Sequence, residues 1–255
     1  MHTRTDVLRA SAEWVWLPRG CDHETTDLQL VRYPARFGGG VRGSRVESSS
    51  DAASVLDRAI EKTRVWGERE LTFWTNESDI PDLEQELQAR GAEHIDTVAV
   101  FAQAIAGISV PVPEDAVAEI IRTEAQIRRM DAVNVAVWGQ KPLDDEGILT
   151  ELAETTRALE DRSGLRVLAA LDGQPVSTGG CTVVDGFVRL WGAATIESAR
   201  GRGSYRAVLA ERLRASAEFG ATTAIVKGRV STSAPILARV GFERFGDERA
   251  YRLEV

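Results

Sequence analysis

The segment Arg200-Gly201-Arg202-Gly203-Ser204-Tyr205 lies between a strand-like run and a helix-like run. Glycine adopts positive φ without strain and lets a backbone come close to a bound group. The helix that follows directs its free N–H groups and the positive end of its dipole toward the same place. The two arginines add positive charge there. The segment therefore predicts an anion site of the kind that holds a phosphate or pyrophosphate.

Other interpretations of this segment compete with an anion site. A glycine-rich turn between a strand and a helix can be a simple connection whose arginines are solvated. The dinucleotide fingerprint G-x-G-x-x-G needs another glycine where the chain has Arg206, and the P-loop pattern G-x-x-x-x-G-K-S/T does not occur. The pattern argues against a dinucleotide or P-loop site and leaves the simple turn as the alternative.

The composition is that of a soluble globular protein of one or two domains, with 43% hydrophobic and 27% charged residues in 255. No apolar run is long enough to span a membrane, and the N-terminus lacks the apolar core of a signal peptide, so we expect a cytoplasmic protein without a membrane partner. Two cysteines and three histidines lack the spacing of a disulfide framework or a metal site: Cys21, Cys181, His2, His23 and His94. We expect no metal.

The net charge of −8 is unevenly placed, since residues 195–255 carry +4 and residues 1–194 carry −12. An acidic protein with a locally basic end is not typical of nucleic-acid binding. It is typical of a protein with one pocket for a small anionic ligand.

Two prolines in Gly107-Ile108-Ser109-Val110-Pro111-Val112-Pro113 favour extended backbone and indicate a domain edge. After this linker, the residue patterns predict alternating elements and two hairpin turns, Asp172-Gly173 and Asp185-Gly186. The predicted elements are a strand at 116–121, helices at 123–138 and 144–162, strands at 165–171, 176–184 and 187–196, a helix from the N-cap Ser204 to Gly220, a strand at 222–226, a helix at 233–239 and two short final strands.

The first part of the chain repeats the pattern of the second. A shift of 150 residues places 71–105 on 221–255, with Gly91-Ala92-Glu93 on Gly241-Phe242-Glu243. The same shift places residues 50–55 opposite the anion segment, and they contain neither glycine nor arginine. We interpret this as a structural repeat whose first copy has lost the anion site. A coincidence between two ordinary strand–helix–strand units is the alternative.

Residues 114–255 resemble the GCN5-related N-acetyltransferase (GNAT) superfamily. Its motif A reads Arg/Gln-x-x-Gly-x-Gly/Ala, with which Arg200 and Gly203 agree, while Tyr205 replaces the usual small residue. A helix, a strand, a short helix and Gly241-Phe242 follow in the family's order. The resemblance implies an α/β (α+β) fold with two GNAT-like mixed-sheet domains. These are a degenerate domain at 1–110 and an acetyltransferase domain with the acyl-CoA N-acyltransferase fold at 111–255.

The resemblance further implies that acetyl-CoA is the acyl donor. In the family, the strand before the glycine segment pairs with the pantetheine arm, here around Ala193 and Ala194. The glycine segment then holds the pyrophosphate. The implied cofactor-binding residues are Ala194, Thr195, Arg200, Gly201, Arg202, Gly203, Ser204 and Tyr205.

The implied activity is transfer of an acetyl group to a primary amine of a small molecule or peptide, by a monomer or homodimer. Two alternatives stay open. One is a noncatalytic CoA-binding sensor or interaction module with the same fold, and the other is an enzyme that uses a different phosphate-bearing ligand.

Catalytic residues cannot be assigned by the resemblance. Relatives often use a tyrosine on the last helix as the acid, and counting back from Gly241-Phe242 places Leu237 there, with Val230 where an asparagine is common. Several other side chains are candidates with ordinary structural alternatives. Ser231, Thr232 and Ser233 are candidate acids, but such hydroxyls are more often helix caps, and Glu197 is a candidate base with a solvated turn residue as the alternative. Tyr205 stacks near the cofactor or the amine, or it packs between helix and sheet. Arg189 and Trp191 are candidates to line the acceptor side, against which strand alternation is expected to bury one and expose the other.

Overall fold

The computed structural model describes residues 2–230 and 234–255. Its contacts divide into two compact units. Unit 1 comprises Ala102–Lys227 and Leu237–Glu243, and unit 2 comprises His2–Phe101, Gly228–Ile236 and Arg244–Val255. Within the described ranges, none of the helices combines the length and the apolar character needed to cross a membrane.

Unit 1 is built on five strands in the order β10-β9-β8-β7-β6, in which only the β9–β10 pair is parallel. The elements of this part of the chain are η2 (Ile105–Gly107), β6 (Ala116–Ile120), α4 (Glu124–Trp138), α5 (Asp145–Glu160), β7 (Gly164–Leu171), β8 (Gln174–Val184), β9 (Phe187–Thr195), η3 (Glu197–Ala199), α6 (Ser204–Glu218), β10 (Thr223–Arg229) and α7 (Ala234–Arg239). These bounds confirm the predicted elements from 116 to 239 to within a few residues.

Both predicted hairpin turns are present. Asp172 and Gly173 have φ of 51° and 74°, and Asp185 and Gly186 have φ of 49° and 79°. Positive φ at both central residues is the geometry that matches the twist of antiparallel strands, which is why Asp-Gly is favoured there. The two turns hold β7, β8 and β9 in one antiparallel meander that leads into the glycine segment.

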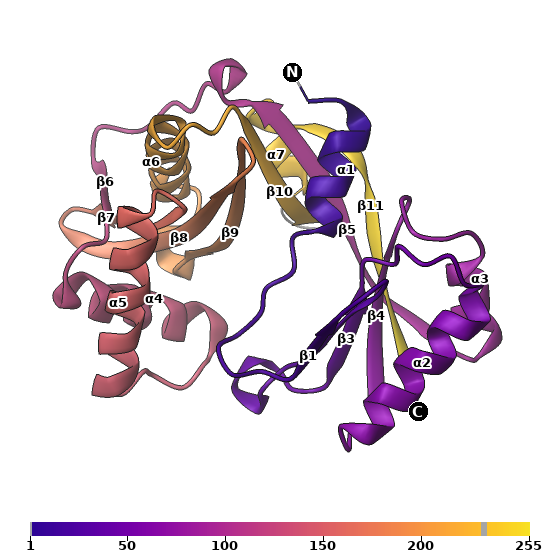
Figure 1. Cartoon of the computed structure of the whole chain (residues 1–255). Coiled ribbons are helices and arrows are strands. Elements are labelled where there is room, and N and C mark those ends of the chain that lie inside the picture. Colours follow the sequence, from indigo (N-terminus) through magenta and orange to yellow (C-terminus); the bar gives the residue numbers. More distant parts are fainter. Residues whose placement is uncertain (1, 231–233) are drawn as a thin grey trace. The chain divides into compact units, whose positions relative to one another are not determined.

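Helices cover both faces of this meander (Figure 1). On one face, Leu168 and Ala194 join the apolar residues of α4 and α5 in a single buried cluster. On the other face, α6 contacts β8, where Cys181 lies 3.4 Å from Ser216 through their side-chain sulfur and oxygen. Successive residues of a strand point to opposite faces, so the meander is buried on both sides.

Unit 2 has the strand order β1-β2-β3-β4-β11-β5, with β3 parallel to β4 and β11 antiparallel to β4. Its apolar core contains residues of α2, α3 and the strands, among them Leu56, Leu87 and Tyr251. The elements of this part of the chain are α1 (Arg4–Ala12), β1 (His23–Thr25), β2 (Gln29–Arg32), η1 (Ala35–Phe37), β3 (Val41–Ser44), α2 (Ala52–Val65), β4 (Glu70–Asn76), α3 (Leu83–Ala89), β5 (Glu93–Ala104) and β11 (Glu243–Glu254).

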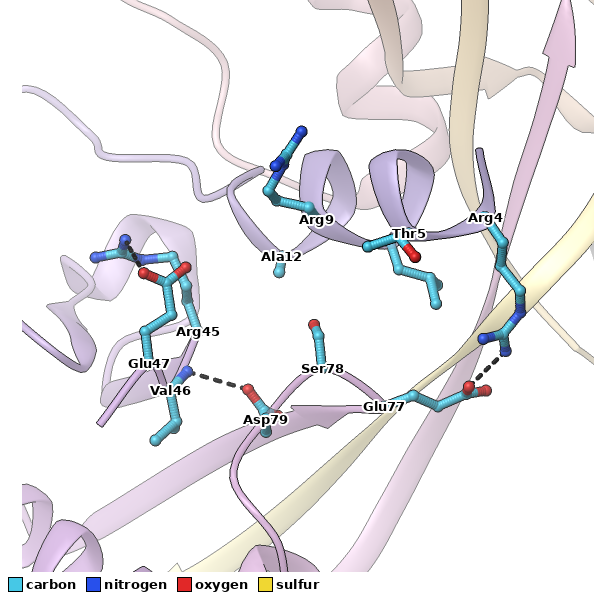
Figure 2. Close-up of a pocket in the computed structure, with 11 residues that line it drawn as sticks. Arg4, Thr5, Arg9, Ala12, Arg45, Val46, Glu47, Glu77, Ser78 and Asp79 are labelled. Carbon is cyan, nitrogen blue, oxygen red and sulfur yellow. Dashed lines mark hydrogen bonds and ion pairs between the residues drawn. The ribbon is translucent and has the colours of Figure 1, made fainter. Parts of the chain in front are cut away.

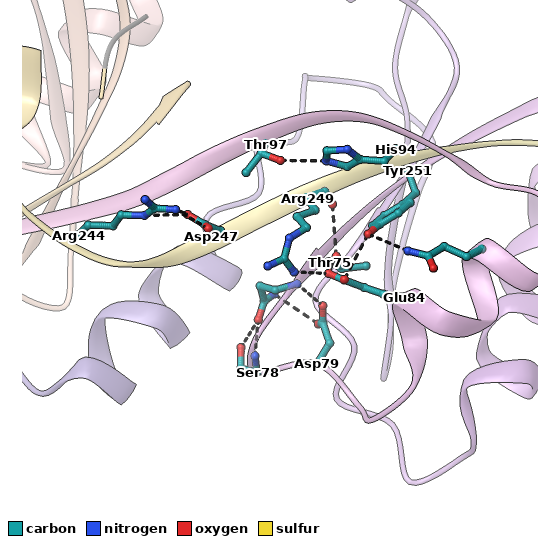
Figure 3. Close-up of polar contacts among 12 residues, drawn as sticks. Thr75, Ser78, Asp79, Glu84, His94, Thr97, Arg244, Asp247, Arg249 and Tyr251 are labelled. Atoms are coloured by element: carbon teal, nitrogen blue, oxygen red, sulfur yellow. Dashed lines mark hydrogen bonds and ion pairs between the residues drawn. The ribbon is translucent and has the colours of Figure 1, made fainter. Parts of the chain in front are cut away.

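The C-terminal strand β11 lies with the N-terminal residues of the chain. It is one strand of 12 residues, so the prediction of two short final strands was wrong. Figure 3 shows how its side chains meet α3: Arg249 Nη1 and Tyr251 Oη donate to the two carboxylate oxygens of Glu84 over 2.8 and 3.2 Å. The division at residue 110 stays a prediction, and the contacts of the described residues assign β11 to unit 2.

The bounds of the elements match the predicted repeat of 150 residues. Subtracting 150 from the residue numbers of β11 gives 93–104, which are the bounds of β5. In the same way α7 covers 84–89, against 83–89 for α3, and α6 covers 54–68, against 52–65 for α2. Residues 52–104 and 204–254 therefore share the order helix, strand, helix, strand, and α2 is the counterpart of α6.

Candidate functional site

Strand β9 separates from β10 before it ends. The two strands pair in parallel from Phe187 to Leu190, and the last pair is Leu190 with Val226. Beyond it, β9 continues to Thr195 while still paired with β8 on its other side. One edge of β9 from Trp191 to Thr195 therefore has no pair with β10 in the described register.

A β-bulge marks the point of separation. Trp191 pairs with Gly180, and Ala194 pairs with Thr178, so Gly192 and Ala193 together face the single residue Gly179. Gly192 has φ of 62°, in the left-handed region that glycine tolerates. A bulge bends its strand and increases the local twist, which accounts for the departure of β9 from β10.

The backbone hydrogen bonds show which residues face the open edge. Ile196 N donates to Val176 O over 3.0 Å, and Ser177 Oγ donates to Ala194 O over 2.9 Å, both toward β8. Because backbone polar groups alternate in direction along a strand, those of Thr195 point away from β8. The Ala194 side chain is buried in the core under α4 and α5.

The helix α6 begins without a side-chain cap. Its N-cap is Gly203, with φ of 90°, and Ala207 N makes a bond of 3.2 Å to Gly203 O. The amides of residues 204–206 lie ahead of that bond and have no acceptor inside the helix. The predicted N-cap Ser204 is instead the first helical residue, because the left-handed turn at position 203 requires glycine.

The Ser204 side chain reinforces the polar character of this end. Ser204 is only 1% exposed, and its Oγ has no hydrogen-bond partner among the described residues. Helices α1, α2, α4 and α5 contrast with α6, because a side-chain oxygen of Thr3, Asp51, Thr123 or Asp144 caps each of them. Together these features leave a group of hydrogen-bond donors without side-chain partners at the start of α6.

The two arginines of the segment differ in their surroundings. Arg202 is 48% exposed and forms ion pairs of 3.5 Å with Asp115 and 3.2 Å with Asp172. Arg200 is exposed and forms no salt bridge within the part of the chain that the structure describes. Arg200 therefore supplies the less compensated positive charge at this place.

The two glycines of the segment also differ. A Cβ on Gly203 would lie 2.5 Å from Pro113 Cγ, while a Cβ on Gly201 would meet nothing within 4 Å. Gly203 is thus required both for its φ and for the close approach of the linker residue Pro113. Gly201, with φ of 78°, is required for its φ alone.

The ring of Tyr205 is half-buried, and the Arg212 guanidinium carbon lies 5.9 Å from the ring centroid. The contact of Tyr205 with a cofactor and its packing between helix and sheet both stay predictions. Arg212 itself was missed by the sequence analysis and is 1% exposed.

Several half-buried polar side chains lie beside the bulge, on the face of the sheet that α4 and α5 cover. The Arg166 guanidinium lies 4.7 Å from the ring centroid of Trp191 and forms an ion pair with Glu151. Burial raises the pKa of Glu151 and lowers the pKa of Arg166, while their mutual attraction opposes both shifts. Arg189 and Trp191 are both half-buried and two residues apart, so they share this face, and the expectation that one would be buried and the other exposed was wrong.

The two positions that the resemblance pairs with proton-transfer groups hold apolar side chains. Leu237 is 2% exposed and belongs to the core, and Val230 is 43% exposed. Glu197 is exposed in the short turn η3, as expected of a solvated turn residue. The hydroxyl candidates Ser231, Thr232 and Ser233 lie outside the described residues.

In unit 2, carboxylates make the hydrogen bonds in the region that corresponds to the start of α6. Asp51 caps α2, and Asp79 Oδ1 accepts a hydrogen bond of 3.0 Å from Val46 N, across the ends of β3 and β4. Figure 2 shows this bond at the wall of a cavity of about 350 Å³, beside the ion pair of Arg4 with Glu77. In the described ranges, no group of three or more His, Cys, Asp or Glu side chains could hold a metal ion.

A parallel strand pair that opens at a bulge, beside a glycine segment that begins a helix, places this chain among the acetyltransferase-like α/β proteins in fold. Solved structures agree. A GCN5-related N-acetyltransferase from Kribbella flavida matches with a TM-score of 0.72 and 20% identity, over 96% of this chain and 94% of that one. One from Sphaerobacter thermophilus matches with a TM-score of 0.68 and 17% identity, over 89% and 76%.

A tandem GNAT protein from the clavulanic acid biosynthesis pathway is also similar, with a TM-score of 0.65 and 14% identity over 98% of this chain and 87% of that one. No protein-family model matches the sequence. No curated protein matches it either. The chain therefore has the GNAT fold, which confirms the predicted fold class, and the order helix, strand, helix, strand occurs in both 52–104 and 204–254.

Proposed function

We propose that this chain is a GNAT-type N-acetyltransferase that transfers an acetyl group from acetyl-CoA to a primary amine of a small molecule or peptide. The observation that carries the proposal is the uncapped start of α6, next to the open edge of β9. Free amides at a helix N-terminus bind phosphate groups well, and Arg200 adds charge to the same place. We further propose that the donor site belongs to residues 111–255, with 1–110 as a degenerate counterpart.

In this proposal the donor lies along β9. The pyrophosphate binds at the six cofactor-binding residues of 200–205, and the pantetheine arm runs from Thr195 back toward Trp191. Four residues of strand cover roughly 13 Å, at about 3.3 Å per residue, which suits an extended arm. The backbone of Thr195 pairs with the arm, and Ala194 supports the strand from the core side. The thioester then lies beside the bulge.

The reaction joins the amine nitrogen to the acetyl carbon and breaks the carbon–sulfur bond. The amine must lose a proton to attack, since free alkyl amines are protonated at neutral pH, and the departing thiolate takes a proton. Charge that develops on the carbonyl oxygen needs donors near the bulge. We assign no residue to either proton transfer.

The first experiment measures the melting temperature with and without acetyl-CoA. A ligand that binds the native state raises the melting temperature, so we expect an increase at saturating acetyl-CoA that Gly203→Glu abolishes. Gly139→Glu is the matched control, because Gly139 also has positive φ, at 65°, and ends α4 in the same unit. An absent shift for the unchanged protein, or an unchanged shift for Gly203→Glu, contradicts the proposed site.

The second experiment separates the enzyme from a binding module. Release of the CoA thiol from acetyl-CoA is followed with a panel of amines, antibiotics and peptides. An enzyme shows amine-dependent thiol release that saturates with the acceptor. A thermal shift without thiol release for any amine supports the sensor or interaction module, and stabilisation by another nucleotide instead of CoA supports a different phosphate-bearing ligand.

A further inference from the structure

The dipeptide Gly179-Gly180 of β8 makes room for two large side chains on opposite faces of the sheet. A Cβ on Gly180 would lie 2.2 Å from the Trp191 ring, and a Cβ on Gly179 would lie 3.1 Å from the Arg212 guanidinium. Real side chains do not tolerate the first of these distances, so Trp191 can lie over Gly180 only because that residue is glycine. Gly179 is also the residue that faces the bulge.

On the α6 face, Arg212 ties the two strands together beside the bulge. Its Nη1 donates to Gly180 O on β8 over 3.1 Å and to Trp191 O on β9 over 3.4 Å. Its Nε donates to Val208 O over 3.4 Å, which fixes the side chain against its own helix. One guanidinium therefore contacts α6 and both strands directly before the point at which β9 bends.

Arg212 is a buried cation without a carboxylate partner. It is 1% exposed, and none of the salt bridges found in the described ranges involves it. Its Nη2 has no hydrogen-bond partner there. Burial of a charge without a counter-ion is costly. An apolar side chain would fill this place at less cost, so the arginine requires a reason other than packing.

On the opposite face, the Trp191 side chain is held at three points. Its ring lies over Gly180, its Nε1 donates to Thr182 Oγ1 over 3.0 Å, and Arg166 stacks near the ring. The residue that precedes the bulge is thus fixed through its carbonyl on one face and through its side chain on the other.

We propose that Arg212 is a positioning residue for the acyl donor, because it holds the bulged part of β9 in the geometry that keeps its outer edge away from β10. This inference rests on the proposed function, since it names the residue that shapes the donor strand. Arg212 touches neither donor nor acceptor in this role. It acts through the Trp191 carbonyl, next to the place where the thioester lies in the proposed complex.

The test compares Arg212→Met and Arg212→Lys with the matched control Arg214→Lys, two residues away on the exposed face of α6. We expect Arg212→Met to raise KM for acetyl-CoA by about tenfold or more, with a smaller change in kcat and in KM for the amine. Arg212→Lys, which keeps the charge and a single donor nitrogen, should recover part of the loss. Arg214→Lys should leave all three constants unchanged.

A second readout does not depend on acetyl-CoA. Hydrogen exchange of the backbone amides of residues 191–196, without ligand, should be faster in Arg212→Met than in the unchanged protein, while exchange in β6 and β7 stays the same. If a folded Arg212→Met variant keeps both its KM for acetyl-CoA and its exchange in 191–196, Arg212 is a core residue and the inference is wrong. If Arg212→Met does not fold, Arg212→Lys carries the same two readouts. A failure of acetyl-CoA to bind the unchanged protein would overturn the proposed function, while the exchange comparison still decides whether Arg212 holds the strand.

Discussion

The carboxylate of Asp51 accepts a hydrogen bond of 2.7 Å from the backbone N–H of Ser54, at the start of α2. Because α2 is the counterpart of α6, this carboxylate takes the place that the cofactor pyrophosphate takes at α6 in the proposed site. The same hydrogen bond lowers the pKa of Asp51. Unit 2 therefore supplies its own anion at the helix start, whereas α6 of unit 1 begins without a side-chain cap.

This relationship predicts how Asp51→Ala behaves. The cap is lost, so the melting temperature should fall by a few degrees, and the increase caused by acetyl-CoA should stay the same. Asp51→Asn, which keeps an acceptor oxygen, should recover most of the fall. The pKa of Asp51 is lower in the folded state, so its contribution is present at neutral pH and lost as the pH falls through that pKa. Scanning calorimetry with and without acetyl-CoA checks this, and a loss of the ligand effect would contradict the assignment of the site to unit 1.

The two glycines of the glycine segment, Gly201 and Gly203, give a second prediction. Gly201→Ala should cost about 1 kcal/mol through positive φ alone. Gly203→Ala should cost more, because its Cβ also meets Pro113 at 2.5 Å, and it should weaken acetyl-CoA binding at least tenfold by displacing the amides of α6. Urea unfolding and isothermal titration calorimetry measure the two effects. Equal behaviour of the two variants would show that the contact with Pro113 does not shape the site.

The elements of unit 1 were predictable because their signals are local. Asp-Gly turns, a glycine segment and apolar spacing each act over a few residues, and the observed bounds follow them. The wrong N-cap had a local cause as well, since Ser204 is a good cap by type while Gly203 alone can adopt a φ of 90°.

The burial of Arg212 and the placement of β11 were not predicted, because both depend on contacts between residues that are distant in the chain. Nothing local to Arg212 distinguishes it from the exposed Arg214 on the same helix, because its burial is decided by the space above Gly179. The placement of β11 next to β4 likewise results from pairing over more than 160 residues, such as Tyr251 with Phe73. The glycine pair at 179 and 180 is a signal that could have indicated two close approaches.

A third prediction concerns the pH dependence of stability through Asp79. Burial raises its pKa from the ordinary value of 3.8 to about 6, although Val46 N and Asn76 N donate to the carboxylate. The pKa of Asp79 is higher in the folded protein than in the unfolded chain. The contribution of its protonated carboxyl to the free energy of unfolding is therefore fully present below about pH 4 and is lost as the pH rises to about 6.

The measurement for Asp79 is the free energy of unfolding of the unchanged protein minus that of Asp79→Asn, by urea titration at several pH values. This difference should fall by up to about 3 kcal/mol between pH 4 and pH 7, since each pKa unit corresponds to about 1.4 kcal/mol. Carboxylates with lowered pKa values, such as Asp27, give the opposite trend and cancel in the difference. A difference that does not vary with pH would show that Asp79 is not buried as described.

The last prediction concerns the strand that joins the end of the chain to its beginning. A fragment of residues 1–110 lacks β11, so seven residues of β4 lose their antiparallel partner and Glu84 loses its contacts with Arg249 and Tyr251 (Figure 3). An unpaired strand edge favours association between chains, so we expect the fragment to unfold without cooperativity or to form oligomers. A peptide of residues 243–255 should restore a cooperative transition, whereas the same peptide with Tyr251→Ala should restore it poorly, because Tyr251 is 3% exposed in the core of unit 2. Circular dichroism and sedimentation velocity measure both effects. A fragment of 1–110 that unfolds cooperatively as a monomer, and does not respond to the peptide, would show that the first part of the chain is complete without β11.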